Sequence, residues 1–408
     1  MTKASSGVLS GSLDDDPPVQ SADTLLAHAG RNPFDNHGVV NPPVYHASTI
    51  VFPTLEAMEE ADRTPYEGTR YGRRGTPTTF ALEDAVAALE GGYRSIAVPS
   101  GLAAITITLL AFLRAGDHAL LVDTVYGPVR RFCDSMLAGL GIESSYYDPL
   151  SDPTPMIRPN TRLLYLESPG SLTFEVQDIP RAAAAARAAG VISVIDNTWS
   201  AGLYLKPLRL GVDVSIQAAT KYIVGHSDVM MGLITTNEEH FLRVKRASSF
   251  LGSAVGPDDC YLALRGLRTL SVRLARHERT GLAVARWLAE QPEVIRVLHP
   301  ALSSCPGHEV WRRDFTGSNG LVAAVLKPLP KPALAAMLDG MQLFRMGVSW
   351  GGFESLIIPF DPRGVRTATR WPDPGPCLRL HCGLEDDGDL IADLHAGFTR
   401  LRAAACRG

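Results

Sequence analysis

Short apolar runs alternate with amphipathic segments through the middle of the chain, and this pattern predicts strands and helices in turn. The predicted strands are 95–98, 119–122, 144–147, 162–167, 191–196 and 212–218, and the predicted helices are 80–89, 102–114, 128–140 and 179–189. Strands that alternate with helices build a mostly parallel sheet with both faces covered. The pattern therefore predicts an α/β fold for this region.

The pattern changes on either side of this region. Residues 21–75 carry little periodicity beyond a short helix at 55–61, which predicts an arm that lies on another surface, such as that of a partner subunit. Residues 258–291 read as one long or broken helix. A smaller α/β unit follows, with predicted strands 320–326, 343–349 and 377–382 and helices 332–338 and 389–405. We expect three parts: lead and arm 1–75, a large domain 76–257 and a C-terminal domain 258–408.

Composition narrows the function. A formal charge of −4 gives no reason to expect nucleic acid or an anionic membrane as partner, and no apolar run is long enough to span a bilayer. The 6 cysteines lack C-x-x-C spacing, which argues against a zinc knuckle and against a disulfide framework, and no metal site is expected. Residues 1–20 lack an apolar core and are expected to be a disordered lead rather than a signal peptide. A reducing cytoplasm is the default location.

Two predicted strands lead to side chains that suit one cofactor. The strand 212–218 runs into Thr220-Lys221, and the strand 191–196 ends in Asp196. A desolvated lysine is a nucleophile toward aldehydes, and a carboxylate can keep a pyridine nitrogen protonated, as pyridoxal phosphate requires. Carboxyl ends of parallel strands share the edge where open sheets bind ligands. A solvent-reaching Lys221 and a helix-capping Asp196 are the alternatives.

Three further segments carry candidate chemistry. Gly101 stands at a strand–Gly–helix junction, which offers backbone N–H groups to a phosphate but matches neither the dinucleotide fingerprint nor the P-loop. Tyr126 follows the strand 119–122 at the same edge, where it either stacks on a planar cofactor or only packs. Tyr71 and Arg73 lie in a Gly- and Arg-rich segment that suits an anion or is a solvated loop.

The C-terminal part holds an isolated charge. Arg379 lies inside the apolar strand 377–382, where an arginine needs an anion, either a substrate carboxylate or a structural Asp or Glu. His381 and Cys382 on that strand are interpreted as packing. A Gly-rich segment, 349–355, follows the predicted strand 343–349.

Seven motifs occur together along the chain: AHAGR, YGRRGTPT, DNTW, SIQAATKYIVGHSD, RGLRTL, SWGGFESL and RLHCGLED. With them the chain, from about Thr24 to its C-terminal helix, resembles the transsulfuration (Cys/Met metabolism) family of pyridoxal-phosphate enzymes, and looks like its bacterial β-lyase branch. The resemblance implies a fold-type I enzyme with an arm, a large cofactor domain and a smaller C-terminal domain. It also implies a homotetramer built of tight dimers.

The resemblance implies a role for each candidate residue. Lys221 would carry the cofactor and shuttle protons, Asp196 would bind the pyridine nitrogen, and Tyr126 would stack on the ring. The phosphate would be held by Gly101, Leu102 and Thr220 of one subunit together with Tyr71 and Arg73 of its neighbour. The substrate carboxylate would be bound by Arg379, with Ser349 and Trp350 assisting.

The chain departs from the family pattern at a few positions. Ala218 stands where many relatives carry a serine, so one phosphate-binding hydroxyl is missing. Val348 stands where related β-lyases carry a tyrosine that lines the substrate pocket. Thr76 replaces an asparagine, as β-lyases tend to do, and Gly127 follows Tyr126 without the cysteine that marks methionine γ-lyases.

The implied reaction is β-elimination of L-cystathionine to homocysteine, pyruvate and ammonia. Methionine or cystathionine γ-lyase, or a carbon–sulfur lyase for cystine or another S-conjugate, are the alternatives, because family motifs do not fix specificity. A non-catalytic cofactor-binding regulator and an aminotransferase are further alternatives from other classes.

Overall fold

A seven-stranded sheet forms the centre of the computed structural model, which describes residues 21–406. The strand order is β1-β7-β6-β5-β4-β2-β3. The strands are β1 Arg94–Val98, β2 His118–Val122, β3 Glu143–Tyr147, β4 Thr161–Glu167, β5 Ile192–Asp196, β6 Val214–Gln217 and β7 Gly232–Thr236. All neighbours run parallel except β7, which is antiparallel to β1 and β6. The predicted α/β fold with a mostly parallel sheet is confirmed, although β7 was not predicted. The expectation of a disordered lead concerns residues 1–20, which lie outside the described residues.

Helices cover both faces of this sheet. They are α3 Pro77–Glu90, α4 Gly101–Phe112, α5 Gly127–Arg131, α6 Ile179–Ala188 and α7 Glu238–Phe250. Alternate residues of a strand point to opposite faces. Along β1, Ile96 and Val98 join one apolar core, whereas Ala97 joins a second core on the other face. The predicted helix 128–140 is α5 followed by a π-helical segment, Phe132–Leu137.

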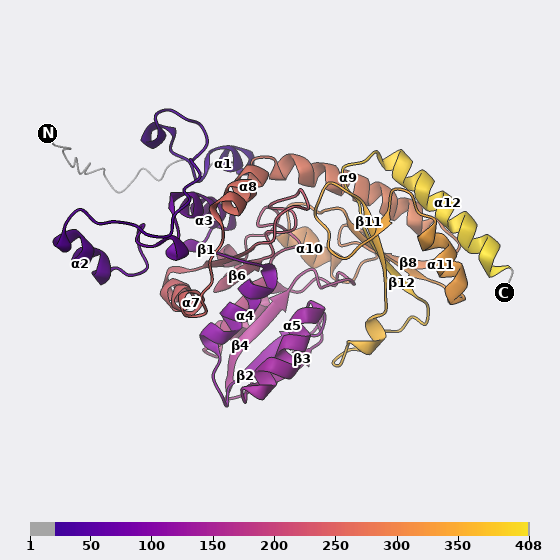
Figure 1. Ribbon diagram of the computed structural model, residues 1–408. Helices are drawn as coiled ribbons and strands as arrows, with labels where there is room; N and C mark the ends of the chain where they lie inside the picture. Colours follow the sequence, from indigo (N-terminus) through magenta and orange to yellow (C-terminus); the bar gives the residue numbers. More distant parts are fainter. Residues whose placement is uncertain (1–20, 407–408) are drawn as a thin grey trace.

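A broken helix leads from the first sheet to a second one (Figure 1). Its halves are α8 Pro257–Leu267 and α9 Leu270–Ala289. The second sheet has the order β10-β11-β12-β9-β8. Its elements are β8 Val294–Leu298, β9 Leu321–Leu326, β10 Arg345–Met346, β11 Leu356–Phe360 and β12 Cys377–His381, with α10 His308–Asp314, α11 Lys331–Asp339 and α12 Asp387–Ala405.

The predicted strand 343–349 is wrong. Only the two residues of β10 are extended in the sheet, and Ser349 has φ of 87°, which no strand residue adopts. The segment 349–352, here called the Gly-rich loop, instead turns toward the first sheet, because Gly351 lies against the backbone of Lys221. β8 and β11 were not predicted.

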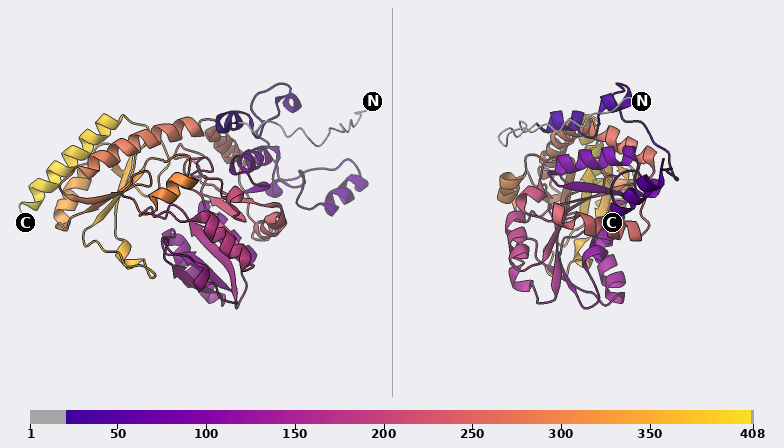
Figure 2. Two further views of the ribbon diagram at one scale, coloured as in Figure 1. Left: turned by 180° about the vertical axis from the view of Figure 1, so that it is seen from behind. Right: turned by 90° about the vertical axis from the view of Figure 1, so that its left-hand side faces the viewer.

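The N-terminal segment begins with α1 Ala22–His28, which packs against α3 and α9. Beyond α1 the segment extends away from the two sheets, with α2 Leu55–Arg63 projecting farthest, as both Figure 1 and Figure 2 show. Large apolar side chains on this segment are open to solvent, with Phe34 91% and Val51 86% exposed. None of the helices among residues 21–406 is long and apolar enough to cross a membrane.

A long excursion between β11 and β12, residues 361–376, ties the second sheet to the first and is here called the strap. The carboxylate of Asp123, which follows β2, accepts hydrogen bonds from the backbone N–H groups of Thr367, Ala368 and Thr369 at 2.9, 3.0 and 2.9 Å. Arg366 of the strap forms a buried ion pair with Glu175 at 2.6 Å. The strap thus fixes the second sheet beside the carboxyl ends of the first.

Candidate active site

Two buried acids lie side by side at the carboxyl edge of the large sheet. Glu167 ends β4 and Asp196 ends β5, and the two residues pair in register. Asp196 is 9% exposed, and its Oδ1 accepts hydrogen bonds from the backbone N and the Oγ1 of Thr198 at 3.0 and 2.5 Å. Burial raises the pKa of Asp196, and burial with the Asp196 charge raises that of Glu167. Because both described bonds of Asp196 end on Oδ1, its Oδ2 is available to a further donor.

Lys221 lies close to this acid but not on a strand. The strand β6 ends at Gln217, and Lys221 stands in the turn that follows, which corrects the expectation of a strand-end lysine. Its Nζ donates to Ser349 Oγ at 2.5 Å and lies 5.4 Å from the centre of the Trp350 ring. Burial, aided by the charge of Arg379, lowers the pKa of Lys221 to about 8, although Asp196 opposes the shift. A neutral, nucleophilic amine is therefore accessible near physiological pH.

Arg379 is a buried cation that has no carboxylate partner within the described part of the chain. The side chain is on β12, the residue is 4% exposed, and Nη2 donates to the Gly347 carbonyl oxygen at 3.4 Å. Its Nε has no partner, and no Asp or Glu among residues 21–406 lies within ion-pair distance of it. Burial lowers the pKa of Arg379 to about 10. The sequence left two possible anions for Arg379, a structural Asp or Glu and a substrate carboxylate. Because the described residues supply no such acid, the anion of a ligand is the remaining partner.

Tyr126 lies close to the two acids and is partly exposed. The residue is 44% exposed, so its ring is not simply packed, and its backbone N–H donates to Glu167 Oε2 at 2.7 Å. Burial and the charges of Asp196 and Glu167 raise the pKa of the phenol. Tyr126 is therefore a protonated donor near neutral pH, and its partly exposed side chain suits stacking on a planar ligand.

The start of α4 forms a candidate phosphate cradle. Ser100 caps the helix by accepting from Ala103 N at 3.0 Å, and Leu102 in its first turn is 41% exposed. A Cβ on Gly101 would lie 2.5 Å from the Ala218 Cβ, so only glycine lets the helix approach the turn after β6. Thr220 Oγ1 accepts from Met231 N at 2.8 Å. The missing hydroxyl at Ala218 thus falls at this cradle.

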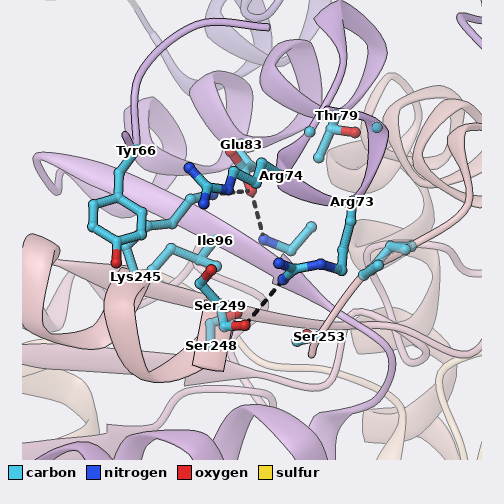
Figure 3. A pocket seen from close by; sticks show the side chains of 15 residues that line it. Tyr66, Arg73, Arg74, Thr79, Glu83, Ile96, Lys245, Ser248, Ser249 and Ser253 are labelled. Atoms are coloured by element: carbon cyan, nitrogen blue, oxygen red, sulfur yellow. Dashed lines mark hydrogen bonds and ion pairs between the residues drawn. The ribbon is translucent and has the colours of Figure 1, made fainter. Parts of the chain in front are cut away.

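Tyr71 and Arg73 lie apart from this cluster. Tyr71 is 47% exposed, and Arg73 Nη1 donates to the Ser249 carbonyl oxygen at 3.0 Å on α7. Figure 3 shows Arg73 in a pocket beside the buried ion pair of Glu83 with Lys245. Lys221, Asp196, Tyr126 and Arg379 are not among the residues that line this pocket. Within one chain, the arm does not complete the site.

Two residues at the site, Glu167 and His381, were not predicted from the sequence to belong to it. Glu167 ends the predicted strand 162–167 as Asp196 ends its own, and the same strand-end argument would have found it. His381 was interpreted as packing, but its Nε2 lies 3.1 Å from Gly351 N. No local signal marks that contact, because the two residues meet through the tertiary fold.

These parts define a class of protein. A pyridoxal-phosphate enzyme of fold-type I requires three groups at one edge of its sheet, and all three are present here. They are a buried lysine of lowered pKa, a buried acid with a free oxygen and the start of a helix. Residues 23–399 match the family described as Cys/Met metabolism PLP-dependent enzyme, and the chain belongs to that family.

Individual relatives cover almost the whole chain. It is 49% identical to a putative cystathionine beta-lyase of Rhizobium johnstonii, over 96% of this chain and 99% of the relative. It is 47% identical to the cystathionine beta-lyase MetC of Escherichia coli, over 93% of this chain and 98% of the relative. The crystal structure of metB from Corynebacterium glutamicum superposes with a TM-score of 0.86 at 31% identity, covering 95% of this chain and 100% of that chain.

Proposed function

We propose that the enzyme is a carbon–sulfur β-lyase that cleaves L-cystathionine to homocysteine, pyruvate and ammonia. The observation that carries the proposal is the buried guanidinium of Arg379, which has no carboxylate partner among residues 21–406 and lies in electrostatic reach of Lys221. A substrate with an α-carboxylate would supply that anion. The 47% identity to a cystathionine beta-lyase supports the reaction type.

The residues at the sheet edge would hold pyridoxal phosphate. Asp196 Oδ2 would accept from the pyridine nitrogen and Tyr126 would stack on the ring. The phosphate would lie at Gly101, Leu102 and Thr220. When bound, the cofactor supplies an aldehyde that takes the substrate amine and a ring that draws electrons from Cα.

The side chains have separate tasks in this proposal. Arg379, with Ser349 and Trp350, binds the substrate carboxylate and so aims the Cα–H bond at Lys221. Lys221, in its neutral amine form, takes the proton from Cα. The electron pair left on Cα expels sulfur from Cβ, and Lys221 or Tyr126 returns a proton to the sulfur. The released enamine takes up water to give pyruvate and ammonia.

The proposal includes an assembly. Tyr71 and Arg73 would bind the phosphate of a neighbouring subunit, because within their own chain they lie away from Lys221. The exposed apolar side chains of the arm support a partner surface. We propose a homotetramer of tight dimers in the cytoplasm, with a cofactor domain at 76–257 and a C-terminal domain at 258–408.

A second candidate is a β-lyase for cystine or another S-conjugate. Val348, next to Ser349, is 85% exposed, and it stands where related β-lyases carry a tyrosine that lines the substrate pocket. A smaller side chain at this position favours a range of sulfur substituents.

The product identifies the reaction. The purified yellow protein is incubated with L-cystathionine, with Lys221→Ala as control, and the keto acid is determined. Pyruvate with homocysteine supports the proposal. 2-Oxobutyrate with cysteine refutes it in favour of a γ-lyase. With no keto acid and an intact cofactor band, cystine is tested next, and pyruvate from cystine identifies the second candidate.

A further inference from the structure

A buried histidine joins the strand of Arg379 to the Gly-rich loop. His381 ends β12, two residues after Arg379, and is completely buried. Its Nε2 lies 3.1 Å from the backbone N of Gly351 and 3.1 Å from the carbonyl oxygen of Gly352. Residues i and i+2 of a strand share a face, so Arg379 and His381 point to the same side of the sheet.

The Gly-rich loop needs such an anchor. Gly351 has φ of +91°, and a Cβ there would lie 2.9 Å from Lys221 Cα. Ser349 has φ of 87°, which is unfavourable for a residue with a side chain. The loop backbone thus adopts a strained path directly against Lys221. Surrounding contacts have to hold this path, and the Nε2 of His381 makes one of them: it accepts from Gly351 N–H in one tautomer and donates to the Gly352 carbonyl oxygen in the other.

The surroundings of His381 keep its ring neutral. Its ring centre lies 5.2 Å from that of His277 on α9 and 5.9 Å from that of Tyr222. Burial, together with the charges of Arg379 and Lys221 and with His277, lowers the pKa of His381 well below its usual value. A neutral imidazole has one donor and one acceptor nitrogen, so its Nε2 can serve a backbone group of the loop.

We propose that His381 is a positioning residue, which holds the Gly-rich loop so that Ser349 and the anion site of Arg379 stand in register with Lys221. This inference rests on the proposed roles of Arg379 and Lys221. His381 itself touches no reacting atom.

Three variants separate positioning from packing. His381→Phe keeps an aromatic ring but loses the Nε2 hydrogen bond to the loop, whereas His381→Gln restores a polar group near the Nε2 position. His277→Phe is the matched control, because His277 is equally buried and bonds to the Cys382 carbonyl oxygen rather than to the loop. If His381→Phe does not fold, His381→Asn replaces it, since the shorter amide does not reach the loop.

Two readouts are used, both on the holoenzyme. Without substrate, we expect amide hydrogen exchange across the Gly-rich loop to rise about tenfold or more in His381→Phe. With L-cystathionine, we expect KM to rise about 10- to 100-fold and kcat to change less than about threefold. His381→Gln should return both values toward the wild type, and His277→Phe should leave the loop exchange unchanged.

Several results would overturn the inference. The first is an unchanged amide exchange of the loop in His381→Phe. The second is an equal rise of that exchange in His277→Phe, and the third is that neither the loop exchange nor KM recovers in His381→Gln. If the wild-type protein does not cleave L-cystathionine, the proposed function fails, but the loop exchange without substrate still decides the role of His381.

Discussion

Replacing Arg379 by methionine should stabilise the protein while weakening its substrate binding. Burial lowers the pKa of this guanidinium from its ordinary value to about 10. At about 1.4 kcal/mol per unit, the charged form is penalised in the folded state by about 3 kcal/mol. One hydrogen bond of 3.4 Å offsets little of that. Methionine fills most of the volume without a charge, so Arg379→Met should raise the free energy of unfolding by about 1–3 kcal/mol without substrate.

The stability gain of Arg379→Met should depend on pH. The folded-state pKa lies below the unfolded value, so the penalty is fully present below about pH 10 and fades as the pH rises from there toward the unfolded pKa. Removing the Arg379 charge should also raise the pKa of Lys221, because that charge is one of the causes of its lowered value. The urea midpoint of the substrate-free holoenzyme at pH 7.5 measures the stability gain.

The activity should move the other way. A carboxylate bound by two charge-assisted hydrogen bonds, each worth about 1.5–3 kcal/mol, would lose about 10²- to 10⁴-fold in binding. Steady-state kinetics with L-cystathionine should therefore show a large rise in KM for Arg379→Met. Arg379→Lys is the matched control, since it keeps the charge but lacks the two-pronged geometry. A variant that is destabilised by more than about 1 kcal/mol, with KM changed less than tenfold, would show that the arginine is structural.

Three further changes test other parts of the site. Lys221→Ala should keep the fold but lose the visible cofactor band and nearly all turnover, so an active variant would contradict the assignment. Glu167 has a raised folded-state pKa, so its contribution to stability is present below its unfolded pKa of about 4.5 and is lost as the pH rises. Glu167→Gln should therefore reduce the fall of stability with rising pH, measured as the urea midpoint between pH 5 and 8. A midpoint that falls as steeply in the variant as in the wild type would contradict this role of Glu167. Asp123→Asn should cost about 2–4 kcal/mol and speed proteolysis within the strap, because charged acceptors bind N–H groups more strongly than amides do. Equal protease resistance of the strap in variant and wild type would refute that role.

The sequence by itself determined the order of the elements and the chemistry that some of them carry. Strand and helix periodicity is a local property, so six of the seven strands of the large sheet, all but β7, and the broken helix before the second sheet were readable in order. Lys221 and Asp196 could be placed at one edge because parallel strands share their carboxyl ends. An arginine within an apolar strand needs an anion wherever it folds, which marked Arg379.

Only the tertiary structure decided how these parts meet. Ser349 is 128 residues from Lys221 in the chain, and their contact depends on a loop whose positive φ overrides the apparent strand 343–349. Whether Arg379 had an acid partner depended on every segment packed around it. His381 looked like packing because hydrogen bonds between distant segments leave no trace in local periodicity. Local pattern fixes which residues are available, and long-range packing fixes which of them act together.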